Sequence, residues 1–309
     1  MAMPAPALTD VVTPPTGTRI LPSGPSALGP YTPPTTLSTA IDLFRRMTAP
    51  VFINGQGPFP FVVDTGANES VISLELAAQL NLPKGPPQPL HSIVDVQMAE
   101  TVTAAEMRVG DRAMTNLRMS ALPADGIGGP GLLGLDRLSD QRLTLNFSDR
   151  RLLLQASKKA RSDPDDIVLA ARRRSGQLTL IDAKVMDETV TAFLDTGAEV
   201  SCGNLKLKTF IQSRIPPDHW RPAAIISVTG QTLEGESATL SSMHVGVLNI
   251  NHLNVVFADL HTFHIWNMVD VPAMVLGIDV LCQFQQVALD FPRNEVLLQL
   301  PDKPLLRIG

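Results

Sequence analysis

An internal repeat constrains the fold of this chain more than any other feature of its sequence. The segment 61–67 (FVVDTGA) returns as 192–198 (AFLDTGA), and 132–136 (LLGLD) returns as 275–279 (VLGID). Further on, 145–147 (LNF) and 152–155 (LLLQ) return as 289–291 (LDF) and 296–299 (VLLQ). Motifs that recur in the same order predict two similar halves, and two copies are too few to bury the faces of a solenoid.

Both halves are built from short apolar runs broken by Gly, Pro, Asn and Asp, a pattern typical of an all-β protein. We expect two β lobes, at 49–155 and 177–309. Each lobe should carry one short helix soon after its Asp-Thr-Gly turn. Ser73 is the predicted N-cap of the first helix and Asn204 that of the second.

Two further segments lie outside the repeat. Residues 1–48 form a proline-rich N-terminal arm, and the prolines argue against a helix or a strand ladder there. Residues 156–176 are rich in charged side chains and predict a surface linker with one short strand or helix at 167–171. We therefore expect the arm to be an extended tether and the two lobes to carry the function.

The Asp-Thr-Gly motif ends a buried apolar strand in each half. An isolated carboxylate leaving such a dry element is costly and must be compensated, which applies to both Asp64 and Asp195. The glycine that follows allows a tight turn and a close approach of the backbone. One copy alone is typical of an ordinary hairpin turn. Two copies at matched positions favour a paired site.

The chemistry of the pair follows from its charge. If the two halves pack about a pseudo-two-fold axis, Asp64 and Asp195 face each other. Carboxylates about 3 Å apart cannot both ionise, so the pair shares a proton. The ionised partner can deprotonate a water while the protonated partner donates to a carbonyl, which amounts to acid–base hydrolysis of an amide.

On these motifs the sequence resembles the retropepsin-like aspartic proteases, in which two such lobes form one active site. The resemblance implies two retropepsin-like β-barrel lobes related by a pseudo-two-fold axis, in a bilobal arrangement like that of pepsin. It implies that Asp64 and Asp195 are the catalytic dyad. It also implies support for the dyad from the rest of each loop: Thr65, Gly66, Ala67, Thr196, Gly197 and Ala198. The next residues, Asn68 and Glu199, would bind the substrate main chain.

The resemblance further implies two β-hairpin flaps that close over an extended peptide. The candidate flaps are residues 93–107 and 226–240. Only the second has a glycine at its tip, Gly230, which we expect to contact the substrate. A flap tyrosine of the pepsin kind is missing, because the one tyrosine of the chain is Tyr31.

Composition narrows the remaining function classes. The net charge of −5 and an aromatic share of 5% argue against a nucleic-acid partner. Cys202 and Cys282 are too few for a four-cysteine zinc site, and we expect two buried thiols, although one disulfide is arithmetically possible. No apolar run is long enough for a transmembrane helix. We expect neither a metal nor a cofactor.

The leading prediction is an aspartic endopeptidase that takes a protein or peptide substrate in extended form. One chain, as a monomer, would suffice for a complete active site. An alternative is a catalytically weak or inactive peptide-binding protein on the same fold. A third is a self-processing zymogen cut in its arm or its linker. The resemblance to single-chain bacterial proteases implies a periplasmic location, with a signal peptide removed.

Overall fold

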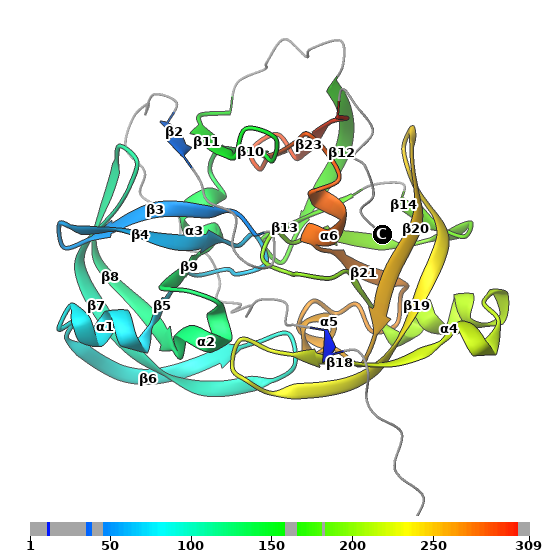
Figure 1. Cartoon of the computed structure of the whole chain (residues 1–309), viewed down its shortest axis with the longest axis horizontal. Helices are drawn as coiled ribbons and strands as arrows, with labels where there is room; N and C mark the ends of the chain where they lie inside the picture. Colours follow the sequence, from blue (N-terminus) through cyan, green and yellow to red (C-terminus); the bar gives the residue numbers. More distant parts are fainter. Residues whose placement is uncertain (1–10, 13–34, 39–45, 158–165, 181–182, 302–309) are drawn as a thin grey trace, which may run out of the picture.

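The computed structural model describes residues 11–12, 35–38, 46–157, 166–180 and 183–301, and it is mostly β (Figure 1). Two β regions are joined by a shared sheet. The largest buried cluster is dominated by aliphatic side chains from both regions, as the scarcity of aromatic residues predicts. Cys202 is buried, Cys282 is half-buried, and neither is in a disulfide. In the described ranges, no helix has the length and apolar character needed to cross a membrane.

The first region is a closed barrel of six strands. Pairing runs in the order β3–β4–β9–β5–β8–β7, and β3 pairs back with β7 to close the ring. One more strand, β6, extends the sheet beyond β7. The strands are β3 (Thr48–Ile53), β4 (Gln56–Val63), β5 (Val71–Ser73), β6 (Lys84–His91), β7 (Val96–Val109), β8 (Arg112–Leu122) and β9 (Gly131–Leu133).

The second region repeats this strand order without the same closure. Pairing runs β18–β19–β20–β17–β21–β16–β13, while β14 pairs with β15 and β19. Residues 181–182, between β13 and β14, lie outside the described residues, and no ring of pairings closes among those described. The strands are β13 (Gln177–Leu180), β14 (Ala183–Val185), β15 (Glu188–Thr189), β16 (Thr191–Leu194), β17 (Cys202–Gly203), β18 (Arg221–Ile226), β19 (Thr232–Val245), β20 (Leu248–Phe257) and β21 (Ala273–Leu276).

Short helices occupy the connections between strands. Both predicted N-caps are confirmed, because the Ser73 side chain accepts the Leu76 N–H at 3.0 Å and the Asn204 side chain accepts the Leu207 N–H at 2.8 Å. The helices are α1 (Leu74–Gln79), α2 (Ala124–Ile127), α3 (Leu135–Leu138), α4 (Leu205–Ile211), α5 (His261–Ile265) and α6 (Ile278–Leu281), with 3₁₀ turns η1 (Gln212–Arg214) and η2 (Pro217–His219).

A shared sheet joins the two regions, in the order β2–β11–β10–β22–β23–β12. At its centre β10 and β22 are antiparallel, and Thr144 pairs with Ala288. Phe147 N–H donates to the Gln285 carbonyl, and Phe291 N–H donates to the Gln141 carbonyl. The strands are β2 (Thr35–Ser38), β10 (Arg142–Asn146), β11 (Arg151–Gln155), β12 (Asp166–Arg174), β22 (Gln286–Asp290) and β23 (Glu295–Gln299).

The arm and the linker carry more strand than expected. The prolines of the arm argue against a ladder, yet β1 (Val11–Val12) pairs with β18, and β2 pairs with β11. Both strands fall on short proline-free stretches, which keep their N–H donors. The rest of the arm up to residue 45 lies outside the described residues. The linker contains β12, which includes the short strand expected at 167–171 and pairs with both β23 and β13.

Candidate active site

The two aspartates stand at the ends of two equivalent strands. Asp64 follows β4 and Asp195 follows β16, and each of these strands pairs in parallel with the strand of an aliphatic-Gly motif, β9 or β21. The ladder continues one step further, because Asp64 N–H donates to the Leu133 carbonyl and Asp195 N–H to the Leu276 carbonyl, both at 3.0 Å. The backbone beneath each carboxylate is therefore fixed by its own region.

The two threonines lock the loops to each other. Thr65 N–H donates to Thr196 Oγ1 at 3.1 Å, and Thr196 N–H donates to Thr65 Oγ1 at 3.0 Å. Each hydroxyl then donates across the interface, from Thr65 to the Leu194 carbonyl at 3.1 Å and from Thr196 to the Val63 carbonyl at 2.8 Å. These bonds are buried, so the two regions hold the aspartate loops in one fixed relation.

The two carboxylates meet in the interior. Asp64 is 0% exposed and Asp195 is 4% exposed, and the Asp64 side chain lies close enough to Asp195 to lower the pKa of that carboxyl. On Asp64, Oδ1 accepts the backbone N–H groups of Gly66 and Ala67 at 2.8 and 3.0 Å. On Asp195, Oδ1 accepts those of Gly197 and Ala198 at 2.9 and 3.2 Å. Burial raises the pKa of Asp195 above its usual value, and these hydrogen bonds oppose that rise.

Gly66 is the glycine on which the close approach depends. A Cβ atom at this position would lie 2.1 Å from Asp195 Oδ2, a separation that real Cβ contacts do not reach. Any side chain there would therefore push the Asp195 carboxylate away from its partner. The Gly66 carbonyl accepts a hydrogen bond from Gln177 Nε2 at 3.0 Å. This side chain of the second region therefore holds the Gly66 loop in place.

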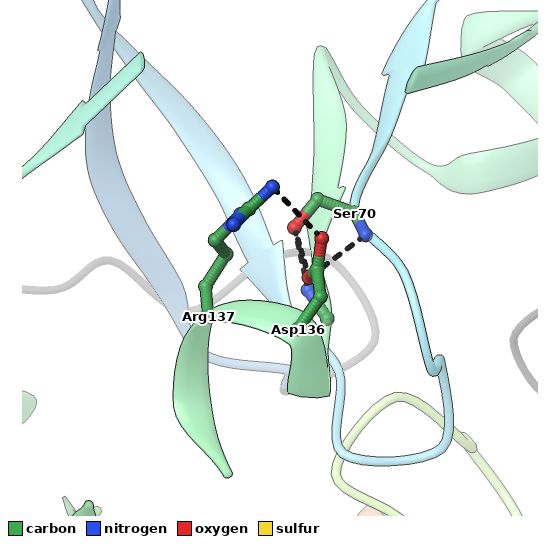
Figure 2. A network of polar contacts seen from close by, with 4 residues as sticks. Ser70, Asp136 and Arg137 are labelled. Atoms are coloured by element: carbon green, nitrogen blue, oxygen red, sulfur yellow. Dashed lines mark hydrogen bonds and ion pairs between the residues drawn. The ribbon is translucent and has the colours of Figure 1, made fainter. Parts of the chain in front are cut away.

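A serine and an aspartate brace each loop from below, and sequence reasoning gave these residues no role. Ser70 Oγ donates to Asp136 Oδ1 at 2.9 Å and accepts the Gly134 N–H at 3.1 Å (Figure 2). Ser201 makes the same contacts with Asp279 and the Gly277 N–H, at 2.9 and 3.1 Å. The signal was present, since a serine stands six positions after Asp64 and again six positions after Asp195.

The two serine–aspartate pairs differ in the charged groups next to the aspartate. Burial raises the pKa of Asp136 and of Asp279, and the bonds from the serines oppose this. Asp136 also has a cation at 3.3 Å, the guanidinium of Arg137, which lowers its pKa (Figure 2). The equivalent of Arg137 in the second region is Val280, so the second brace lacks that contact.

Asn68 and Glu199, the predicted substrate-binding residues, are held by side chains from the opposite region. Gln177 Nε2 donates to Asn68 Oδ1 at 3.2 Å. Arg46 Nη2 lies 3.9 Å from Glu199 Oε1, with both side chains at most 6% exposed. Sequence reasoning missed Arg46 and Gln177. These residues are 131 positions apart, as Thr65 and Thr196 are, so they occupy equivalent places in the repeat. Each loop is thus tied across the interface by an equivalent pair, one ionic and one neutral.

Two hairpins, β6–β7 and β18–β19, coincide with the predicted flaps. Their tips are residues 92–95 and 227–231, so the predicted segments contain most of each tip and second strand but omit β6 and nearly all of β18. Gly230 is an exposed residue of the second tip with a φ of +82°, a left-handed conformation that favours glycine. Its contact with substrate stays a prediction.

Each hairpin tip packs an apolar side chain into the opposite region. Ile93 of the first tip belongs to the buried cluster around Phe193 and Phe263 of the second region. Val228 of the second tip belongs to the buried cluster around Val62 and Leu132 of the first region. The tips also meet each other, because Gln231 Nε2 donates to Asp95 Oδ2 at 3.5 Å. Both hairpin tips are therefore packed against the opposite region.

A histidine pair fastens the first hairpin to the second region. His91 Nδ1 lies 3.0 Å from His261 Nε2 of α5, and their rings stack with an interplanar angle of 4°. Burial lowers the pKa of His261, and the neighbouring His91 lowers it further, while Asp95 opposes the change. The pair accordingly favours a state in which His261 is neutral.

Comparison with known proteins assigns the first region. Residues 49–140 match the family described as gag-polyprotein putative aspartyl protease. This stretch, a retropepsin-like aspartyl protease domain, contains Asp64 and forms the closed six-strand barrel. The match does not extend to the second region, which holds Asp195. A search of curated proteins finds no match to the chain.

Proposed function

We propose that the protein is an aspartic endopeptidase whose dyad is Asp64 and Asp195. The observation that carries the proposal is that these two carboxylates are buried together on loops joined by reciprocal threonine bonds. A retropepsin-like domain supplies the first aspartate. The repeat of the same loop supplies the second, in the same chain.

The geometry favours hydrolysis by an activated water without a covalent intermediate. Two neighbouring buried carboxyl groups hold one proton between them most stably, and the raised pKa of Asp195 is consistent with that state. Titration then belongs to the pair rather than to either residue. The ionised oxygen takes a proton from water, whose oxygen attacks the carbonyl carbon while the protonated carboxyl donates to the carbonyl oxygen. The C–N bond then breaks as the pair returns a proton to the leaving nitrogen.

We also propose that the two regions are retropepsin-like lobes related by a pseudo-two-fold axis, in a pepsin-like bilobal arrangement. The register of the shared sheet supports this, because Thr144 and Ala288 occupy equivalent places in the repeat and pair with each other. The same symmetry relates the two threonines and the two serine braces. In this arrangement one chain contains both halves of the active site.

Hydrolysis of an unstructured peptide mixture, followed by mass spectrometry across acidic to neutral pH, tests this function. We expect the wild-type protein to cut internal peptide bonds. Asp64→Asn and Asp195→Asn should each lose about 10²- to 10⁴-fold in rate. Asp218→Asn, at an exposed position on η2, is the matched control and should retain full activity. Full activity of either dyad variant would refute the two-carboxylate mechanism, and peptide binding without cleavage would favour the inactive alternative.

A further inference from the structure

The outer edges of the two hairpins differ in their capacity to bind another strand. His91 of β6 and Ile226 of β18 are the last strand residues before each tip, pairing with Val96 and Thr232. Two positions earlier stand Pro89 in β6 and Ala224 in β18. The same structural position therefore has a backbone N–H in the second hairpin and none in the first.

The direction of these N–H groups follows from a proline in β18. Pro222 pairs with Glu236 of β19 but has no backbone N–H to donate. Its position is therefore a non-hydrogen-bonded one, at which the backbone polar groups point away from β19. Antiparallel strands alternate in this respect. Ala224 and Ile226 therefore direct their N–H groups to the outer edge of β18.

The edge of β6 is closed by its sequence. Pro89 pairs with Met98 and leaves no donor at the outward position, and Pro86 and Pro87 precede it. The Pro86 carbonyl is already occupied, accepting Thr101 Oγ1 at 2.9 Å and the Arg118 guanidinium. The next outward donor is at His91, whose ring is held by His261. Prolines on an edge strand are a common block to strand addition.

The edge of β18 already accepts a strand. β1 pairs with it in parallel, Val11 with Ala224 and Val12 with Ile225. This places an extended segment of the chain along the outward-facing groups of Ala224 and Ile226. Addition of an extended peptide to a sheet edge is a recurrent mode of recognition, with affinity from main-chain hydrogen bonds.

We propose that the protein binds extended polypeptide asymmetrically, through the backbone of Ala223–Ile226 on β18 and not through β6. This deepens the proposed function, on which it rests, by naming the edge that holds the substrate main chain. The partner is an unstructured peptide segment with free N–H groups. The segment Val11–Val12 of the arm occupies the same edge and competes with it.

Proline exchange between the two hairpins tests the proposal. The probe is a fluorescent peptide of residues 8–13, whose binding is followed by anisotropy. The background carries Asp64→Asn to prevent cleavage and Val12→Pro to weaken the pairing of the arm. Ala224→Pro removes an outward donor and should weaken binding about fivefold to tenfold. Pro89→Ala is the matched control on β6, and its binding should stay within about twofold of the background.

Two further measurements keep the test decisive. Ile226→Pro removes the other outward donor and should weaken binding as Ala224→Pro does, and circular dichroism checks that both variants fold. Weakening by neither variant, or an equal loss from Pro89→Ala, would overturn the proposal. Binding does not require catalysis, so an inactive wild type with asymmetric binding would refute the peptidase while supporting the binding edge.

Discussion

The carboxyl group of Asp195 is where the demands of stability and of chemistry conflict most directly. Burial raises its pKa in the folded chain above the usual 3.8. A group with a raised folded pKa contributes stability that is fully present below the unfolded value and is lost as pH rises through the folded value. At neutral pH the buried, ionisable pair is therefore a cost to the fold.

Asp195→Asn should consequently be more stable than the wild type at neutral pH. The amide keeps an oxygen for the Gly197 and Ala198 N–H groups and gains N–H donors toward Asp64. The gain in free energy of unfolding should shrink as pH falls, because the wild-type group then protonates. Urea denaturation at neutral and acidic pH measures it. A variant less stable than wild type at neutral pH would contradict the cost assigned to this carboxyl.

The Arg46–Glu199 and Gln177–Asn68 pairs offer an internal comparison at the same scale. Arg46→Met removes a cation from beside a buried carboxylate and should cost about 3 kcal/mol of unfolding free energy. The double variant Arg46→Gln with Glu199→Asn copies the neutral pair of the other loop and should cost much less. Chemical denaturation compares the two. A double variant as unstable as the single one would show that charge compensation is not what matters at this loop.

At the scale of elements, the histidine pair couples the first hairpin to α5. The pKa of His261 is lowered in the folded chain from its usual 6.5, so its contribution to stability is full above that value and lost as pH falls. The titratable groups facing it are His91, Asp95 and His264. Protonation of both stacked rings would place two like charges side by side and favour opening of the hairpin.

His261→Phe keeps a ring against His91 but removes one titrating group. We expect the free energy of unfolding of this variant to fall less steeply than that of the wild type as pH decreases below about 6.5. Hydrogen exchange at residues 92–95, corrected for intrinsic rates, should show the same difference, with helix α1 (Leu74–Gln79) as internal control. Identical pH slopes for the two proteins would argue against a role for this histidine.

Local elements were predictable where their signals are local. The helices at Leu74 and Leu205 follow from a capping residue and apolar spacing, and both caps form as expected. Strands β1 and β2 were missed because two to four residues carry little pattern, and their partners β18 and β11 are far away in sequence. The predicted flaps also omit their first strands. For β6 the reason is that Pro86, Pro87 and Pro89 are untypical of a strand.

The candidate site, too, was predictable from local motifs but not where it depends on contacts between distant segments. The repeat predicted Asp64 and Asp195 as a candidate pair, because a motif that occurs twice stands out without any structure. Arg46 and Gln177 lie outside the repeated motif, and each side chain reaches a loop of the other region. Their role depends on how the two regions pack, which no local pattern encodes. Ser70 and Ser201 were visible at matched positions but had no partner assigned.

At the scale of the whole molecule, the shared sheet and the threonine bonds make the two regions one unit. β10 and β22 pair along their full length, and the loops of Thr65 and Thr196 hydrogen-bond across the same interface. Under the proposed function, Asp64 and Asp195 of one chain form one active site. Specific activity should therefore not fall on dilution, as it would for a site built between two chains.

The most direct measurement mixes the two inactive variants, Asp64→Asn and Asp195→Asn, in equal amounts and assays the mixture for peptide hydrolysis. Each chain keeps one aspartate of the dyad. A site contained within one chain predicts that the mixture is as inactive as either variant alone. Recovery of activity on mixing would show that the aspartates of different chains combine, which would contradict the intramolecular dyad.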